Sequence, residues 1–139
     1  MASAILEAPA RITLNDFMTG LLAGLAAHRV KVVSIREAEF YTAVVKTFEE
    51  LERTVAGTNV RLRFWLTQDD THGDAPEVRE GITKAVQRDL ISLDNPTYQQ
   101  MRLKIAEDDA EGYLARVPGG PELYMKLAEI FMREYRAYS

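Results

Sequence analysis

A capping box followed by a long amphipathic segment constrains the fold more than any other feature of this sequence. Ser34 and Glu37 begin and end the run Ser-Ile-Arg-Glu, in which each side chain can accept a hydrogen bond from the other residue's backbone N–H. The apolar residues that follow recur every three or four positions, and they are Tyr41, Val44, Val45, Phe48, Leu51 and Val55. This spacing predicts a helix over residues 35–56 that buries one face and ends at Gly57.

A second helix is expected to begin at Thr13, whose hydroxyl can cap the first free N–H groups. Its apolar residues share one face, and they are Leu14, Phe17, Met18, Leu21, Leu22 and Leu25. Gly20 and Gly24 each weaken this helix by about 1 kcal/mol relative to alanine. Two interpretations stay open: their four-residue spacing lets another helix approach closely, or the helix is simply a weak one.

Three more helices are expected later in the chain. Residues 75–89 form the first, with Asp74 as its cap and a proline in its first turn. Residues 107–117 and 122–138 form the other two, separated by the break Pro-Gly-Gly-Pro at 118–121. The expected inner positions are Val78, Ile82, Ala85, Val86, Ala110, Tyr113, Leu114, Leu123, Leu127, Ile130, Phe131 and Tyr135.

Strands are indicated where the apolar period falls to two. Residues 60–66 alternate, so that one face is buried and the other carries Arg61, Arg63 and Trp65. Residues 90–92 and 97–105, joined by the turn Asp-Asn-Pro, are expected to form a hairpin. The sequence therefore predicts an α+β, mostly helical protein with about five helices and a small antiparallel sheet. Residues 13–139 are expected to form a single globular domain after a flexible lead-in over 1–12.

Composition excludes several classes of protein. The chain of 139 residues has no cysteine, which removes disulfide frameworks, thiolate metal sites and cysteine nucleophiles. Its longest apolar run, residues 20–27, is far shorter than the roughly 20 residues of a membrane-spanning helix. The first ten residues lack the basic and apolar regions of a secretory signal. We therefore expect a cytoplasmic protein that does not bind a membrane.

The order of elements over residues 75–115 resembles the second half of a winged helix-turn-helix domain. Residues 86–92 match the "Leu-Ile" step that ends a recognition helix, residues 93–105 match the two-stranded wing, and residues 106–114 match the helix that follows it. The family also places a short helix between its first strand and the recognition helix. If residues 60–66 are that strand, only residues 67–73 occupy the gap, so the helix-turn-helix part is expected to be degenerate.

The resemblance implies double-stranded DNA as one candidate partner. The candidate side chains are Arg79, Thr83, Lys84, Gln87 and Arg88 on helix 75–89, with Arg102 and Lys104 on the wing. Arginine and glutamine read base edges, and lysine contacts phosphates. Residues 75–105 hold five basic and four acidic residues, however, and the whole chain has a net charge of −4. This balance provides little attraction for a polyanion and is equally typical of a solvated helix face.

A protein partner is the other candidate. Arg61, Arg63 and Trp65 form a basic and aromatic row that suits an interface, unless the last helix covers it. The last helix carries more large apolar side chains than one inner stripe requires, including Tyr124, Phe131 and Tyr135. A homodimer, or a complex with a different protein, is therefore expected.

Catalytic and metal sites receive less support. The loop Asp-Asp-Thr-His-Gly-Asp at 69–74 offers oxygen and nitrogen donors, but its spacing does not match a calcium loop. His28 is expected at the end of the first helix, where a charged imidazole is favourable. We expect no catalytic residue, no metal and no cofactor.

The sequence thus favours a non-enzymatic regulatory or adaptor protein that acts through protein–protein contacts. An antitoxin, a defence-system component or a transcription accessory of a bacterium would suit such a chain. Two alternatives stay open: a DNA-binding transcriptional regulator that uses residues 75–89 and 90–105, and a small metal-binding protein or enzyme centred on loop 69–74.

Overall fold

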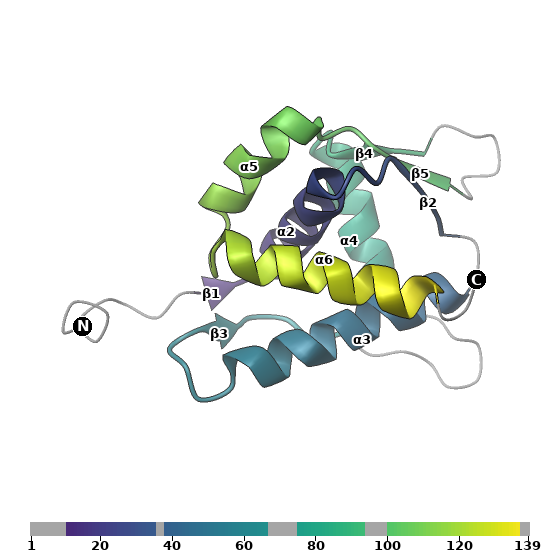
Figure 1. The fold of residues 1–139 in the computed structure, drawn as a ribbon. Coiled ribbons are helices and arrows are strands. Elements are labelled where there is room, and N and C mark those ends of the chain that lie inside the picture. Colours follow the sequence, from purple (N-terminus) through teal and green to yellow (C-terminus); the bar gives the residue numbers. More distant parts are fainter. Residues whose placement is uncertain (1–10, 36–37, 67–74, 94–99, 137–139) are drawn as a thin grey trace.

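The computed structural model describes residues 11–35, 38–66, 75–93 and 100–136. Within these ranges the chain forms an α+β fold dominated by helices, as the sequence predicts (Figure 1). The helices are α2 (Leu14–Ala27), α3 (Ala38–Val55), α4 (Pro76–Gln87), α5 (Glu107–Arg116) and α6 (Pro121–Arg136). The strands are β1 (Arg11–Ile12), β2 (Val32–Ser34), β3 (Arg61–Leu62), β4 (Ile91–Ser92) and β5 (Gln100–Leu103).

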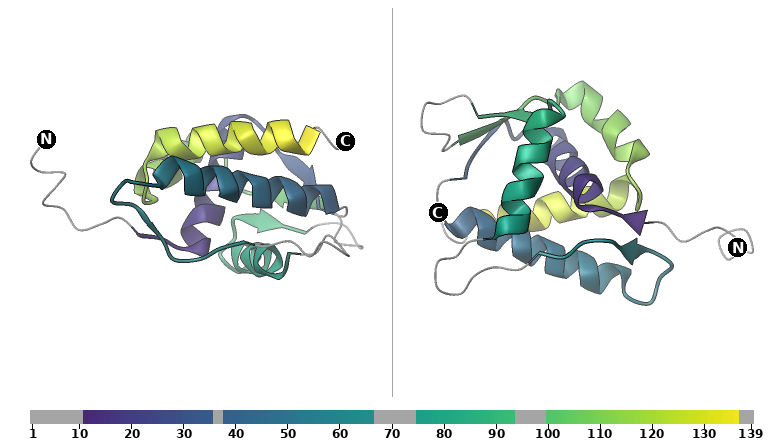
Figure 2. Two further views of the ribbon diagram at one scale, coloured as in Figure 1. Left: turned by 90° about the horizontal axis from the view of Figure 1, so that it is seen from below. Right: turned by 180° about the vertical axis from the view of Figure 1, so that it is seen from behind.

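Helix α2 lies at the centre of the molecule, with α4, α5 and α6 packed around it (Figures 1 and 2). Its predicted start is confirmed: the Thr13 hydroxyl accepts from the Asp16 N–H at 3.2 Å, and the Asp16 carboxylate accepts from the Thr13 N–H at 3.0 Å. The predicted apolar residues from Phe17 to Leu25 are buried, and so is every other residue over 17–26. A helix surrounded by others must be apolar or small on all sides.

Gly20 and Gly24 let α6 approach α2 closely, which decides between the two interpretations of their spacing. A Cβ atom placed on Gly20 would lie 2.2 Å from Cδ1 of Tyr124. One placed on Gly24 would lie 2.8 Å from the Tyr124 carbonyl oxygen and 2.9 Å from Cβ of Ala128. These distances are well inside van der Waals contact, so any larger residue would push the helices apart.

Helices α3 and α6 lie side by side and run in opposite directions, as Figures 1 and 2 show. Phe40 of α3 meets Phe131 of α6 edge-on, with 5.9 Å between ring centroids. The predicted helix is confirmed over residues 38–55, but Ile35 lies outside it and Ser34 ends strand β2. Glu37, the other half of the predicted capping box, lies outside the described residues.

Helix α4 begins with proline at its first position, as predicted. The expected cap, Asp74, lies outside the described residues, and Ala75 stands at the N-cap. Val78, Ile82 and Ala85 are buried as expected. Val86 was expected on the same inner face but is 38% exposed, because it lies at the margin of the stripe.

A three-stranded antiparallel sheet with the order β2-β5-β4 packs beside α2 and α4. The predicted pairing of residues 90–92 with 97–105 is confirmed, with Ile91 opposite Leu103 and Ser92 opposite Arg102. The inner positions Met101, Leu103 and Ile105 are buried as predicted. The third strand, however, is β2, in which Val32 pairs with Arg102. Residues 60–66 do not join this sheet.

Strand β3 instead pairs in parallel with β1, with Arg11 opposite Arg61 and Ile12 opposite Leu62. The N–H of Arg63 extends this ladder by donating to the Ile12 carbonyl at 2.8 Å. Ile12 is fully buried, and Arg11 and Ile12 form strand β1 at the end of the segment expected to be a flexible lead-in. Only Arg61 and Leu62 have strand geometry, yet the alternation predicted over residues 60–66 is preserved.

Candidate functional site

The outer side of the β1–β3 pair presents three arginines and a tryptophan, which we call the Arg-Trp face: Arg11, Arg61, Arg63 and Trp65. All four side chains are exposed, and Trp65 is 69% exposed. The predicted row of Arg61, Arg63 and Trp65 therefore faces solvent and is not covered by the last helix. Arg11 joins it because the parallel register places Arg11 directly opposite Arg61.

The core holds this face in position from behind. Leu66 is buried, and Leu62 and Phe64 are half-buried against the hydrophobic core. The Phe64 ring lies 5.3 Å from that of Phe17 and 5.1 Å from that of Phe48, measured between centroids. Because side chains alternate along an extended chain, anchoring Leu62, Phe64 and Leu66 turns their neighbours outward.

The Arg-Trp face carries positive charge that the described residues do not balance. Within the described ranges no hydrogen bond or ion pair joins the side chains of Arg11, Arg61 or Arg63 to another residue. Like charges on directly opposite positions of adjacent strands repel each other. An acidic group bound at this face would relieve that repulsion.

The α6 residues proposed for partner binding are located in the core or beside it. Tyr124 is 0% exposed and Phe131 is 2% exposed, so neither can form an interface in this fold. Tyr135 is half-buried and donates its hydroxyl hydrogen to the Ser34 carbonyl at 2.8 Å. The surplus of apolar side chains has a different cause: α6 packs against both α2 and α3, so it needs two apolar sides.

Burial also changes the chemistry of Tyr124. The surrounding apolar atoms, and secondarily the negative charge of Asp16, raise the pKa of its hydroxyl well above its ordinary value. The hydroxyl donates to the Pro118 carbonyl at 2.8 Å, which ties the start of α6 to the preceding turn.

The candidate DNA-binding side chains of α4 are accessible, but Arg79, Lys84 and Arg88 have contacts within the chain. Arg79, Thr83, Gln87 and Arg88 are exposed, and Lys84 is half-buried. Nζ of Lys84 lies 3.4 Å from the Glu80 carboxylate. Nη1 of Arg88 donates to the Thr19 hydroxyl at 2.8 Å, which fastens α4 to α2.

The two wing candidates lie on the outer face of the sheet. Arg102 and Lys104 are exposed, whereas Met101 and Leu103 point inward, as the alternation predicts. The Lys104 ammonium pairs with Asp89, the residue that follows the C-cap of α4. The structure thus brings the end of α4 and the end of β5 together.

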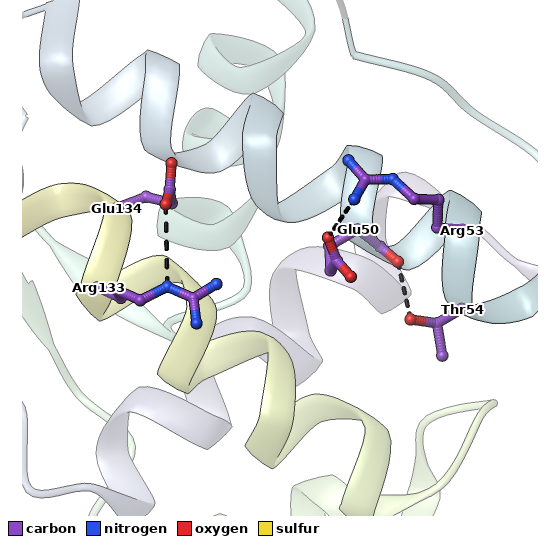
Figure 3. A network of polar contacts seen from close by, with 5 residues as sticks. All are labelled: Glu50, Arg53, Thr54, Arg133 and Glu134. Atoms are coloured by element: carbon purple, nitrogen blue, oxygen red, sulfur yellow. Dashed lines mark hydrogen bonds and ion pairs between the residues drawn. The ribbon is translucent and has the colours of Figure 1, made fainter.

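A polar groove of about 220 Å³ lies between α3 and α6 (Figure 3). Its charged side chains balance, with Lys46, Arg53 and Arg133 against Glu49, Glu50 and Glu134. The ion pairs form within each helix: Arg53 reaches Glu50 at 2.9 Å, and Arg133 reaches Glu134 at 3.9 Å. We interpret this groove as a solvated seam between two packed helices.

The structure gives no support to a metal site in the part of the chain that it describes. Among these residues no three His, Asp or Glu side chains gather closely enough to hold a metal ion. Loop 69–74, which carried the metal or enzyme alternative, lies outside the described residues. His28 stands at the C-cap of α2, as predicted, with Nε2 3.7 Å from the Glu129 carboxylate.

Comparisons with protein-family models, with curated proteins and with solved structures found no match to this chain. Among the described helices, none is both long and apolar enough to cross a membrane.

Proposed function

We propose that this protein is a regulatory or adaptor protein that binds an acidic segment of another protein through its Arg-Trp face. The observation that carries the proposal is the exposed Trp65 beside three arginines that no described carboxylate neutralises. Tryptophan and arginine are the residues most enriched where binding energy concentrates in protein interfaces.

The free energies expected from burying Trp65 and from ion pairs of the arginines are sufficient for such a contact. An aromatic side chain buries up to about 250 Å² at an interface, and at about 25 cal/mol per Å² this corresponds to several kcal/mol for Trp65. Each exposed ion pair adds only about 0.2–1 kcal/mol. Trp65 would therefore supply most of the affinity, while Arg11, Arg61 and Arg63 would select an acidic partner and speed association.

Charge argues for an acidic protein over nucleic acid at this face. Three arginines can contact few phosphates, and the whole chain has a net charge of −4, which repels a long polyanion. A symmetric dimer through the same face would bring both sets of arginines together, so the partner is a different protein and not a second copy. An antitoxin, defence or transcription-accessory role in a bacterial cytoplasm would use such a contact.

The proposal is tested by capturing partners from extracts of the source cells on immobilised wild-type protein and on variants. Arg61→Glu/Arg63→Glu and Trp65→Ala are expected to lose a partner that the wild type retains. Lys46→Glu/Lys126→Glu is the matched control, because it changes the net charge equally at exposed positions elsewhere. A partner set that is identical for all variants would contradict the proposal.

A DNA-binding regulator of the winged-helix type is the second candidate. What supports it is the order of elements along the chain. Helix α3 follows strand β2 of the antiparallel sheet and precedes α4. Helix α3 thus occupies the place where the winged-helix family has a short helix before its recognition helix. The long connection over residues 56–75, which includes β3, departs from a tight helix-turn-helix.

This second candidate is tested with a labelled random-sequence DNA duplex at low and moderate salt. Binding through phosphates would weaken steeply with added salt. Arg79→Ala and Arg88→Ala should each reduce that binding, whereas Arg61→Glu/Arg63→Glu should not. Absence of binding at low salt would remove this candidate and leave the Arg-Trp face proposal unaffected.

A further inference from the structure

A cleft of about 560 Å³ lies where the end of α2, the end of β5 and the start of α5 meet. This volume falls in the range of about 300–1,000 Å³ that is typical of small-molecule sites. Figure 1 shows this junction on the opposite side of α2 from strand β3. The cleft is thus separate from the Arg-Trp face.

The charges around the cleft are strongly unequal. Its lining includes four basic side chains, Arg29, Lys31, Arg102 and Lys104, and a single carboxylate, Glu107. Four minus one leaves a formal excess of three positive charges in the lining itself. Lys104 pairs with Asp89 beside the cleft, and Arg102 also has a contact within the chain. The groove between α3 and α6, by contrast, is balanced. A concave surface with one sign of charge concentrates its potential on a bound anion.

The backbone holds these basic residues in place. Arg29 adopts a left-handed conformation with φ of 67°, which ends α2 and turns the chain toward Lys31. The Lys31 carbonyl accepts from the Leu103 N–H at 2.8 Å, so Lys31 is fixed beside the end of β5. Nε of Arg29 lies 2.9 Å from the Glu107 carboxylate, which joins the two rims of the cleft.

The start of α5 adds backbone donors to the same place. Ala106 and Glu107 line the cleft, and Ala106 is the N-cap of α5. The alanine side chain cannot cap the helix, and the Ala106 carbonyl accepts from the N–H groups of Asp109 and Ala110. Among the described residues, the N–H groups of Glu107 and Asp108 therefore stay available. The acidic first turn of α5, which includes Asp108 and Asp109, opposes an anion and limits how far the ligand can extend along that helix.

The lining also has an apolar part, which consists of Ala26, Val30, Leu103, Ile105 and Ala106. A site with cations at its rim and apolar side chains beside them suits an anion that carries an organic group. We propose that this cleft binds a small organic phosphate of nucleotide size, with the phosphates held by Lys31, Arg102 and Lys104.

Calorimetric titration of the whole protein with orthophosphate, pyrophosphate and ADP tests the proposal. Pyrophosphate and ADP should bind with one site per chain, and ADP should bind more tightly because its nucleoside contacts the apolar lining. Amide signals of Lys31, Leu103 and Glu107 should shift in the nuclear magnetic resonance spectrum. Lys31→Glu should weaken binding by at least about tenfold, since a charged hydrogen bond is lost and repulsion replaces it.

Lys46→Glu is the matched control, because it makes the same charge change at an exposed position on α3. It should leave the affinity within about twofold of wild type, since the cleft is distant and salt screens the charge. Equal weakening by both variants would overturn the proposal in favour of a net-charge effect. Binding of none of the three anions, or Lys31-dependent binding of duplex DNA alone, would also overturn it.

Discussion

The ring of Tyr124 rests directly on the backbone of Gly20, where a Cβ atom would lie only 2.2 Å from the ring. This contact seats α6 on the central helix and brings the Tyr124 hydroxyl to the Pro118 carbonyl. Since α6 also packs on α3, the contact fixes the relative position of three helices. The Arg-Trp face depends on that arrangement, because Phe17 of α2 and Phe48 of α3 together support Phe64.

Gly20→Ala should destabilise the protein even though alanine favours helix formation. The gain in helix propensity is about 1 kcal/mol, whereas forcing a methyl group into an occupied space costs about 1–3 kcal/mol or more. We expect a net loss of free energy of unfolding, measured by urea denaturation. Gly24→Ala should act in the same direction because its Cβ would meet Ala128 and the Tyr124 backbone.

Gly112→Ala is the control for this prediction. Gly112 lies in α5, where an added Cβ would meet no described atom within 4 Å. The same substitution should therefore raise the free energy of unfolding by up to about 1 kcal/mol. If Gly20→Ala proved as stabilising as Gly112→Ala, the close contact between α2 and α6 would be disproved.

Tyr124→Phe should change how stability depends on alkaline pH. Burial raises the pKa of Tyr124 above 10.0, its value in the unfolded chain, so the folded state retains the proton more tightly. The resulting stabilisation is complete below pH 10.0 and is lost as the pH rises from there toward the folded-state pKa. Wild type should therefore lose about 1.4 kcal/mol per pH unit more than the variant in that interval.

At neutral pH, Tyr124→Phe should cost about 1 kcal/mol, because the Pro118 carbonyl loses its hydrogen bond. Urea denaturation at several pH values would measure both effects on the same samples. Parallel stability curves for wild type and variant above pH 10.0 would show that the Tyr124 hydroxyl is not buried as described.

Thr13→Ala should cost about 1 kcal/mol, within a usual range of about 0.5–2, because it removes the side-chain oxygen that caps α2. Thr83→Ala, on the exposed surface of α4, is the comparison that should leave stability nearly unchanged. Thermal unfolding of both variants would measure the difference. Equal midpoints for the two variants would contradict the capping role of Thr13.

The helices could be predicted because their signals are local. Thr13 with Asp16, the apolar stripe of residues 38–55 and the break at 118–121 each lie within a few turns of the chain. Strand β2 was missed because its three residues carry no pattern and pair with β5, which lies far along the sequence. Pairing between such distant segments depends on the assembled core, and a prediction from local sequence patterns contains no information about that core.

Part of the candidate site could also be predicted, because its signal lies within a few neighbouring residues. Alternation over residues 60–66 indicated that Arg61, Arg63 and Trp65 share an outer face. Arg11 could not be assigned to that face, because only the parallel register with β3 brings it there. The cleft could not be predicted from local patterns either, because Arg29, Arg102 and Glu107 come from three separate segments of the chain.

Fluorescence of Trp65 offers the most direct test of the Arg-Trp face, because it is the only tryptophan in the chain. We would titrate the protein with an acidic peptide of alternating glutamate and leucine, and with its lysine and leucine counterpart. We predict a saturable blue shift with the acidic peptide alone, and its loss in Arg61→Glu/Arg63→Glu. An emission spectrum unchanged by the acidic peptide, or shifted equally by both peptides, would contradict the proposal.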